Sequence, residues 1–152
     1  MSQRHYKIPR YQVSLVKESS EEAWEPVPVM NPKDAVNAVR PYLETMDREA
    51  FITIQLDAKN RIIGDYIVSV GGLSKTVAHP REVFKVAILQ NAASIICAHN
   101  HPSGDPEPSP EDIELTKNLE LAGKVLGIKI LDHIIIGHDG NYVSMKEREV
   151  IH

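Results

Sequence analysis

Apolar side chains recur along this 152-residue chain in the short alternating and continuous runs that are typical of β-strands. Two β-branched runs, 50–57 and 62–70, flank the polar turn 58–61 and therefore predict a β-hairpin. Three later apolar runs predict further strands, near residues 93–101, 128–136 and 141–145. Between these runs lie segments with helical spacing, so strands and helices are interspersed along the chain.

A capping residue followed by proline marks the start of two helices. Asn31 precedes Pro32, and Ser109 precedes Pro110. We expect Pro41 to break or kink the first of these helices, because proline lacks the backbone N–H of a helix interior. The predicted helices lie near residues 32–46, 80–91 and 110–126. Strands with interspersed helices predict a single α/β sandwich with a mixed sheet.

The N-terminal residues differ in character from the rest of the chain. Residues 10–16 alternate like a strand, and the acidic, proline-bearing segment 18–29 predicts a surface connection. The polar start lacks the apolar core of a signal peptide, and no run approaches the about 18 apolar residues of a membrane span. The single cysteine, Cys97, cannot form an internal disulfide, and we expect it to be a small buried side chain. These features predict a cytoplasmic protein without a membrane partner.

The charge balance argues against a nucleic-acid partner. The formal net charge is −4, from 17 basic and 21 acidic residues, and the basic residues are scattered without forming a stripe. Direct binding of nucleic acid is therefore not expected. A zinc deaminase is also excluded, because that class needs a Pro-Cys-x-x-Cys motif and this chain has one cysteine.

Two histidines and an aspartate have the spacing of a metal site. His99 and His101 end the apolar run 93–101, and residues two apart in a strand point to the same face. Asp112 opens the next helix, after a turn rich in proline and glycine. The three can occupy three corners of a zinc tetrahedron and leave the fourth for water, as in catalytic zinc sites. The alternative is that Asp112 only completes a capping box with Ser109, while each histidine serves packing.

The spacing of these residues resembles the signature of the JAMM (MPN+) metalloproteases. The signature is His99-x-His101, seven intervening residues, Ser109, two more residues and Asp112. Longer stretches are similar to the RadC-type JAB domain, a bacterial group historically labelled as DNA repair proteins, at residues 77–84, 98–109 and 131–137. This resemblance implies a Zn²⁺ ion held by the two histidines and the aspartate.

The resemblance also implies a fold and its boundaries. We expect an α-β-α sandwich of the JAB/MPN type over residues 31–148. Residues 1–30 would form an N-terminal strand and connection, and residues 149–152 a short tail.

In JAMM enzymes an upstream glutamate moves the proton of the attacking water. Glu44, Glu49 and Glu82 are candidates, and the element order of the family points to Glu49, just before the first strand of the hairpin. Each glutamate also fits a solvated or helix-end carboxylate. The family serine corresponds to Ser109, which would donate a hydrogen bond to the developing oxyanion, although N-capping alone also accounts for a serine here.

A second acidic residue and histidine stand together in Asp132-His133, within the apolar run 128–136. Neighbouring residues in a strand point to opposite faces, so this pair is not expected to bind one ion. We expect a structural role, with His133 as a hydrogen-bonded buried residue.

The expected activity is metal-assisted hydrolysis of an amide bond in a protein or peptide substrate. Zinc would supply the hydroxide, Glu49 would shuttle its proton, and Ser109 would help to hold the oxyanion. The alternative is a non-catalytic module that binds a metal and serves interaction or DNA repair. An exchangeable water on the metal favours the enzyme, whereas a closed site with four protein ligands favours the module.

Overall fold

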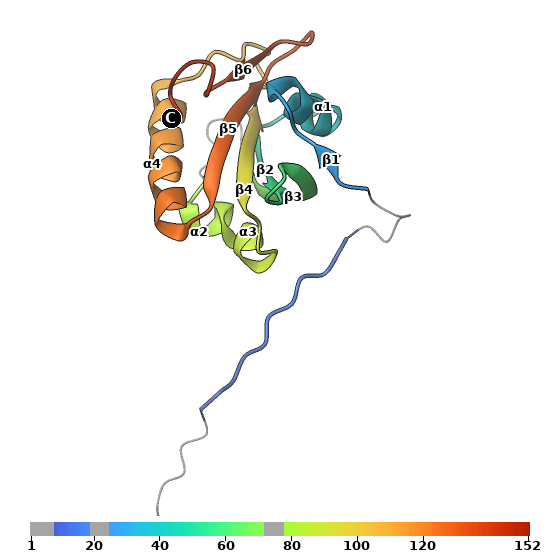
Figure 1. The fold of residues 1–152 in the computed structure, drawn as a ribbon. Coiled ribbons are helices and arrows are strands. Elements are labelled where there is room, and N and C mark those ends of the chain that lie inside the picture. The colour runs from blue at the N-terminus through green and yellow to red at the C-terminus, as the bar shows by residue number, and fades with distance from the viewer. Residues whose placement is uncertain (1–7, 19–24, 72–77) are drawn as a thin grey trace, which may run out of the picture.

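The computed structural model of the chain describes residues 8–18, 25–71 and 78–152. Within these residues the strands form a mixed six-stranded sheet in the order β1-β3-β2-β4-β5-β6 (Figure 1). The strands are β1 (Val27–Pro28), β2 (Ala50–Leu56), β3 (Arg61–Val70), β4 (Ser94–Asn100), β5 (Lys129–Ile136) and β6 (Tyr142–Ser144). The helices are α1 (Pro32–Leu43), α2 (Pro80–Val83), α3 (Lys85–Leu89) and α4 (Pro110–Leu126). The predicted α/β class is confirmed.

The strand that carries the first histidine lies in the interior of the sheet. β4 pairs antiparallel with β2 and parallel with β5, and every residue of β4 is buried. A strand covered on both faces is expected to be apolar, and residues 95–98 of β4 are, whereas the polar His99 and Asn100 stand at its carboxyl end. A parallel neighbour requires a crossover, and α4 supplies it between β4 and β5. The carboxyl end of β4 is therefore followed closely by the first turn of α4.

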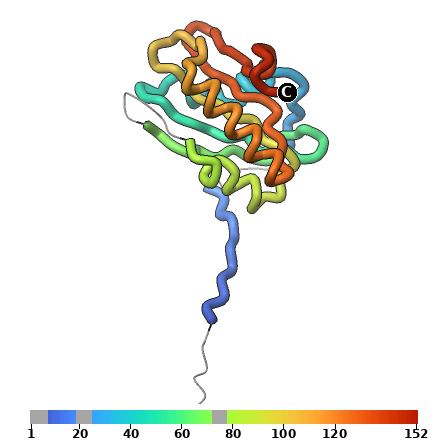
Figure 2. The backbone as a smooth tube through the Cα atoms, turned by 90° about the vertical axis from the view of Figure 1, so that its left-hand side faces the viewer, coloured from blue at the N-terminus to red at the C-terminus, as the bar shows by residue number. Residues whose placement is uncertain are grey.

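Helices cover both faces of the sheet. One core cluster joins α1 to the sheet through Ala35, Val36, Val39 and Leu43. The other joins α2, α3 and α4 to the opposite face through Val83, Phe84, Ala87 and Leu119. Figure 1 shows α1 and α4 on opposite sides of the sheet, and Figure 2 shows α4 in front of it. Successive residues of β4 supply the two clusters in turn, because strand side chains alternate between faces.

Most predicted elements are confirmed, with small shifts in their bounds. The hairpin consists of β2 and β3, and the later strands are β4, β5 and β6. Pro41 lies in the last turn of α1 and does not break it, because its missing N–H removes one hydrogen bond of the helix and the helix ends two residues later. The prediction of one helix over 80–91 was wrong, since α2 and α3 meet at Phe84. The Phe84 side chain is completely buried, and the break turns it into the core.

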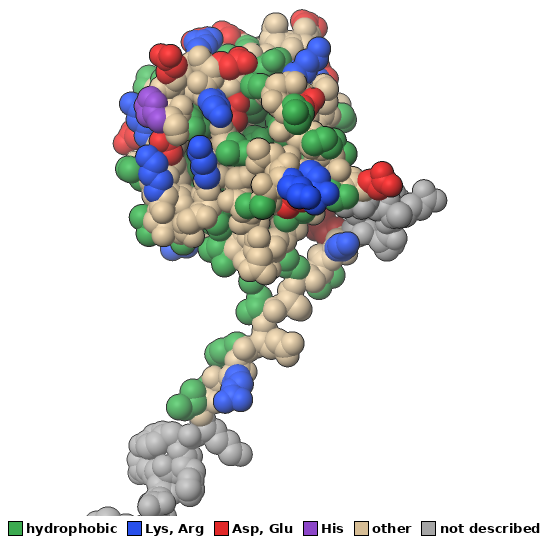
Figure 3. All heavy atoms as spheres, viewed as in Figure 1, with side chains coloured by type: hydrophobic (Ala, Val, Ile, Leu, Met, Phe, Trp, Pro, Cys, Tyr) green, Lys and Arg blue, Asp and Glu red, His purple; other side chains and the backbone are tan. Residues whose placement is uncertain are grey.

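The structure corrects the expected strand at residues 10–16. Residues 8–17 form no regular secondary structure and are exposed, and Figure 3 shows this segment extending away from the body of the protein. A strand is stable only when its backbone groups find partners, and no described residue pairs with this segment. Within the predicted connection 18–29, residues 19–24 lie outside the described part, and Val27 and Pro28 form β1 against β3.

Candidate metal centre

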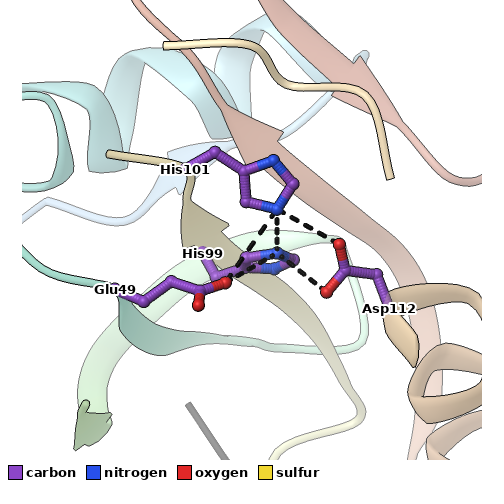
Figure 4. Close-up of side chains that lie close together, drawn as sticks. All are labelled: Glu49, His99, His101 and Asp112. Carbon is purple, nitrogen blue, oxygen red and sulfur yellow. Dashed lines mark hydrogen bonds and ion pairs between the residues drawn. The ribbon is translucent and has the colours of Figure 1, made fainter. Parts of the chain in front are cut away.

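Four side chains from separate parts of the chain meet near the carboxyl end of β4. Glu49 directly precedes β2, His99 lies in β4, His101 follows β4, and Asp112 lies in the first turn of α4. One ligand atom from each side chain lies within 4.8 Å of the other three. We call these four residues the cluster, and Figure 4 shows their side chains converging. The structure therefore brings together the three expected ligands and the expected base.

Within the cluster, Asp112 contacts both imidazoles from one side. His99 Nε2 and His101 Nε2 are 3.1 Å apart. Asp112 Oδ2 lies 3.1 Å from His101 Nε2, and Asp112 Oδ1 lies 3.4 Å from His99 Nε2. Glu49 Oε1 lies 3.6 Å from His99 Nε2 and 3.9 Å from His101 Nε2, so it faces the same point from the other side.

The other two candidate glutamates have different partners. Glu44 follows α1 and forms an ion pair with Arg40 of that helix. Glu82 lies in α2 and its carboxylate is 2.7 Å from the ammonium of Lys85. Neither belongs to the cluster, and Glu49 is the candidate that the fold places beside the histidines.

The backbone on both sides of Glu49 is tied to β4 by Asn100, the residue between the two histidines. The Ala50 N–H donates to Asn100 Oδ1 at 2.8 Å, and Asn100 Nδ2 donates to the carbonyl of Arg48 at 3.0 Å. The Glu49 carbonyl in turn accepts from the N–H of Gly71 at 2.7 Å. Asn100 therefore fixes the approach of Glu49 to the histidines, a role that the sequence analysis missed.

Asp112 is both a capping residue and a member of the cluster. The Ser109 N–H donates to Asp112 Oδ2 at 2.9 Å, and the Asp112 N–H donates to Ser109 Oγ at 3.1 Å, which completes a capping box. Burial raises the pKa of Asp112, but its contacts with His101 and His99 outweigh burial and hold the pKa well below its ordinary value. The two interpretations of Asp112 are thus compatible, because the cap orients the carboxylate toward the imidazoles.

The loop between β4 and α4 is held by two glycines that approach each other closely. His101 N donates to the carbonyl of Ile136, and the Gly104 N–H donates to the carbonyl of His101. Gly104 has φ +91°, a conformation that favours glycine. A Cβ on Gly137 would clash with the Gly104 carbonyl oxygen. A side chain at either position would therefore displace the loop that brings His101 and the start of α4 together.

His99 is buried and its ring is held on two sides. It stacks on Phe51 with ring centroids 6.0 Å apart, and its Nδ1 lies 2.7 Å from His133 Nε2. His133 is 1% exposed, which fits the expected buried histidine, but its contact with His99 was missed. The contact depends on the pairing of Cys97 with His133 between β4 and β5, which no local pattern states. The one feature of the sequence that pointed to His133 was the presence of a histidine within a largely apolar strand.

The donor atoms of the cluster fit a divalent cation. His101 Nδ1 lies 2.8 Å from the carbonyl oxygen of Asp105, which can only accept, so Nδ1 carries a proton and Nε2 is the ring nitrogen that faces the cluster. His101 Nε2 faces carboxylate oxygens, which favour a positive charge at this position: a second ring proton in the metal-free protein, or a cation bound in its place. Burial lowers the pKa of His101, but hydrogen bonds to Asp112 and to the Asp105 carbonyl outweigh it and raise this pKa. Imidazole nitrogen and carboxylate oxygen are also the ligands that Zn²⁺ takes in proteins.

Comparison with known proteins places the chain in a family. Residues 29–150 match the RadC-like JAB domain. A UPF0758 protein of Methanosarcina mazei is 52% identical over 119 residues, which cover 78% of this chain and 52% of that protein. A UPF0758 protein of Moorella thermoacetica is 51% identical over 123 residues, which cover 81% of this chain and 53% of that protein. The chain spans about half the length of these curated relatives. It belongs to the RadC-like JAB domain family.

Proposed function

We propose that this chain is a zinc-dependent hydrolase of amide bonds, a JAMM-type peptidase or isopeptidase on an α-β-α sandwich of the JAB/MPN type. The observation that carries the proposal is the convergence of His99, His101 and Asp112 with Glu49 within 4.8 Å. Membership of the RadC-like JAB domain family supports it. The substrate is a protein or a peptide, the class that the JAMM resemblance implies.

In this proposal His99, His101 and Asp112 hold the ion, with two neutral nitrogens and one negative oxygen. When bound, Zn²⁺ acts as a Lewis acid and lowers the pKa of a coordinated water to about 7. The capping box and the Asp105 carbonyl keep Asp112 and His101 oriented before the ion arrives. Little reorganisation of these side chains is then needed on binding, which favours affinity.

Glu49 is the proposed general base and acid. Its side chain is 22% exposed, compared with 3% for that of His99, so its carboxylate lies at the solvent side of the cluster. A carboxylate at this position can take a proton from an attacking water and deliver it to the leaving amine. Asn100 keeps the backbone of Glu49 in place during both transfers.

Ser109 is the proposed donor to the oxyanion. In the capping box Ser109 Oγ accepts a hydrogen bond from the Asp112 N–H, which leaves its own hydroxyl proton able to donate. Capping and oxyanion stabilisation are therefore compatible in one side chain. The serine lies directly beside the Asp112 carboxylate, so a carbonyl bound at the cluster would come close to it.

The partner and the location follow from charge and composition. The net charge is −4, and Figure 3 shows acidic and basic side chains interspersed on one face of the protein, an arrangement that does not favour a polyanion. No helix among the described residues is long and apolar enough to cross a bilayer. Cys97 is buried and unpaired, which agrees with a reducing compartment. We propose a cytoplasmic enzyme that acts on a protein or a peptide.

The alternative is a non-catalytic metal-binding module for interaction or DNA repair. It has its own observation, because Glu49 Oε1 lies within the same 4.8 Å group as the three other ligand atoms. If Glu49 binds the ion as a fourth ligand, the site is closed and has no position for water. The role of Glu49 therefore separates the two functions.

The first experiment measures zinc per chain by elemental analysis of the wild type, His101→Ala, Asp112→Ala and Glu49→Gln, with folding checked by circular dichroism on the same samples. The enzyme predicts about one zinc per chain in the wild type and in Glu49→Gln, and loss of zinc in the two ligand variants. Loss of zinc from folded Glu49→Gln would instead support the closed module. A wild type without zinc after reconstitution would overturn the metal site.

The second experiment tests catalysis. Zinc-loaded wild type and zinc-loaded Glu49→Gln are incubated with a peptide library and with isopeptide-linked peptides, and new termini are detected by mass spectrometry. Cleavage by the wild type that falls at least about 100-fold in Glu49→Gln supports the proposed base. Equal cleavage by both proteins would reject Glu49 as the base.

A further inference from the structure

A third buried histidine forms a hydrogen-bonded chain between α4 and the cluster. His133 Nε2 lies 2.7 Å from His99 Nδ1, on the side of the His99 ring opposite the cluster. His133 Nδ1 lies 2.7 Å from Thr116 Oγ1, and the Thr116 hydroxyl donates to the carbonyl of Asp112 at 2.7 Å. Asp112 and Thr116 are one helical turn apart, so the same face of α4 contacts the cluster directly and through His133.

The donor and acceptor roles along this chain follow from the groups themselves. The Thr116 hydroxyl has one proton and gives it to the Asp112 carbonyl, which can only accept. Thr116 Oγ1 must therefore accept from the other side, so His133 Nδ1 carries a proton and donates it. His133 is 1% exposed, and no carboxylate hydrogen bonds to its ring among the described residues, so it is neutral and has one ring proton.

The same reasoning sets the protonation of His99. A neutral His133 that donates from Nδ1 presents a lone pair at Nε2, so the hydrogen bond from His99 must be donated by His99 Nδ1–H. A neutral His99 with its proton on Nδ1 has its lone pair on Nε2. His99 Nε2 is the atom that faces His101 and Asp112.

We propose that His133, oriented by Thr116, is a positioning residue that holds His99 in the tautomer and the ring orientation needed to bind a metal through Nε2. The inference rests on the proposed metal site and adds a residue to it. His101 is oriented by the Asp105 carbonyl, whereas His99 is oriented by a neutral imidazole and a hydroxyl. Outer partners of this kind typically change metal affinity about 10–100-fold when they are removed.

A purely structural role for His133 makes a different prediction. Its ring contacts Phe51 edge-on with centroids 5.3 Å apart, so packing alone is served by any ring or apolar side chain of similar size. Packing would not depend on a hydroxyl at position 116. The positioning role does, because without that acceptor His133 Nδ1–H is buried and unsatisfied. His133 then gains by moving its proton to Nε2 and donating it to His99, which moves the His99 proton to Nε2 and blocks the metal-binding atom.

The test compares Thr116→Val, which removes the hydroxyl at nearly constant volume, with Thr116→Ser, which keeps it. Thr53→Val is the matched control, because Thr53 is also buried and its Oγ1 also accepts a buried hydrogen bond, from Gln55 in β2. Two quantities are measured for each protein. One is the His99 tautomer in the metal-free protein, from ¹⁵N shifts of labelled histidine, and the other is the dissociation constant for Zn²⁺ by competition with a chelator.

The expected results are specific. The wild type shows His99 protonated at Nδ1, and Thr116→Val shows a shift toward the Nε2–H tautomer with zinc affinity about 10–100-fold lower. Thr116→Ser restores both readouts, while Thr53→Val changes thermal stability but neither readout. A second pair of variants tests the proposal at position 133 as well. His133→Leu is expected to lose zinc affinity, and His133→Gln to retain more of it, because an amide oxygen can accept from His99 Nδ1–H.

Two outcomes would overturn the inference. One is an Nε2–H tautomer of His99 in the metal-free wild type, and the other is unchanged zinc affinity in folded Thr116→Val and His133→Leu. Failure of the proposed metal site looks different, because the wild type would then bind no zinc, and failure of catalysis alone would leave zinc binding and both readouts unchanged. The tautomer measurement on the metal-free protein still decides the positioning role if no zinc binds.

Discussion

At the scale of single residues, the centre depends on side chains that each have two tasks. Asp112 closes the capping box of α4, and its two carboxylate oxygens also face the cluster, one toward His99 and the other toward His101. Asn100 completes β4 and fixes the backbone around Glu49. The structural and chemical tasks are compatible because a capping carboxylate or an amide retains free lone pairs after its first hydrogen bond.

The two tasks of Asp112 can be separated by substitution. In Asp112→Asn an amide oxygen can still accept from the Ser109 N–H, but the negative charge is lost. We expect zinc affinity to fall by more than the about 10–100-fold of outer-partner changes, while the metal-free protein changes in stability by less than about 1 kcal/mol. Asp112→Ala loses the cap as well and should cost about 1 kcal/mol more. Urea unfolding measures the change in stability, and zinc titration measures the change in affinity. A wild-type zinc affinity in Asp112→Asn would contradict the assignment of Asp112 as a metal ligand.

Cys97 gives a second residue-scale prediction. The thiol is completely buried in β4, and burial raises its pKa far above the ordinary value, so thiolate is scarce near neutral pH. We expect the native protein to be inert to a thiol reagent such as DTNB at pH 8 for hours. The guanidinium-unfolded protein, as control, should react with one equivalent. Rapid reaction of the native protein would show that the thiol is accessible and reactive.

At the scale of elements, the loop from β4 to α4 sets the separation of the ligands. Its shape depends on the contact of Gly104 with Gly137 and on the hydrogen bond from His138 N to the Gly104 carbonyl. This bond ties the loop to the segment that follows β5. The loop is therefore fixed to the ends of β4 and β5 rather than being a free connection, and it places His101 against Asp112.

A methyl group at position 137 tests this role of the loop. Gly137→Ala places a Cβ against the Gly104 carbonyl, and we expect a loss of about 1–3 kcal/mol in stability together with weaker zinc binding, since the loop must move. Gly127→Ala is the control, because Gly127 has φ +72° and no atom near its Cβ position. It should cost about 1–2 kcal/mol through backbone strain and leave zinc affinity unchanged. Equal zinc affinity in both variants would show that the loop tolerates displacement.

At the scale of the whole molecule, the cluster joins two layers of the fold. Glu49 directly precedes β2 and the histidines lie at the carboxyl end of β4, so antiparallel pairing brings them together where these strands end, and α4 brings Asp112 from the covering layer. A bound ion would therefore connect the sheet to α4. Binding to the folded state alone must stabilise that state.

Removal of zinc should lower the melting temperature of the whole domain. At free zinc about 100 times the dissociation constant, binding adds about 2.7 kcal/mol to the free energy of unfolding. For a chain of this size that corresponds to a rise of about 5–10 °C, which differential scanning calorimetry detects and which EDTA should reverse. Asp112→Ala should show no rise. An unchanged wild-type melting temperature after zinc loading would argue against a site specific to the native state.

Local rules in the sequence by themselves determined much of this protein. Strand alternation placed His99 and His101 on one face, and a capping residue before proline placed Asp112 in the first turn of α4. The hairpin and the later strands could also be predicted from the sequence, because their apolar runs and turns are local features. The break between α2 and α3 could not be predicted in this way, because it depends on how the Phe84 side chain packs into the core.

The tertiary structure decided which distant residues join these local groups. Phe51 pairs with His99, so β2 brings Glu49 rather than Glu44 or Glu82 to the cluster. His133 reaches His99 only because β5 lies parallel to β4 in one particular register. Strand pairing is a choice among segments far apart in the chain, and its energy comes from packing and hydrogen bonds that exist only once the sheet has formed. For this reason the local pattern identified the ligands, and only the assembled sheet identified their partners.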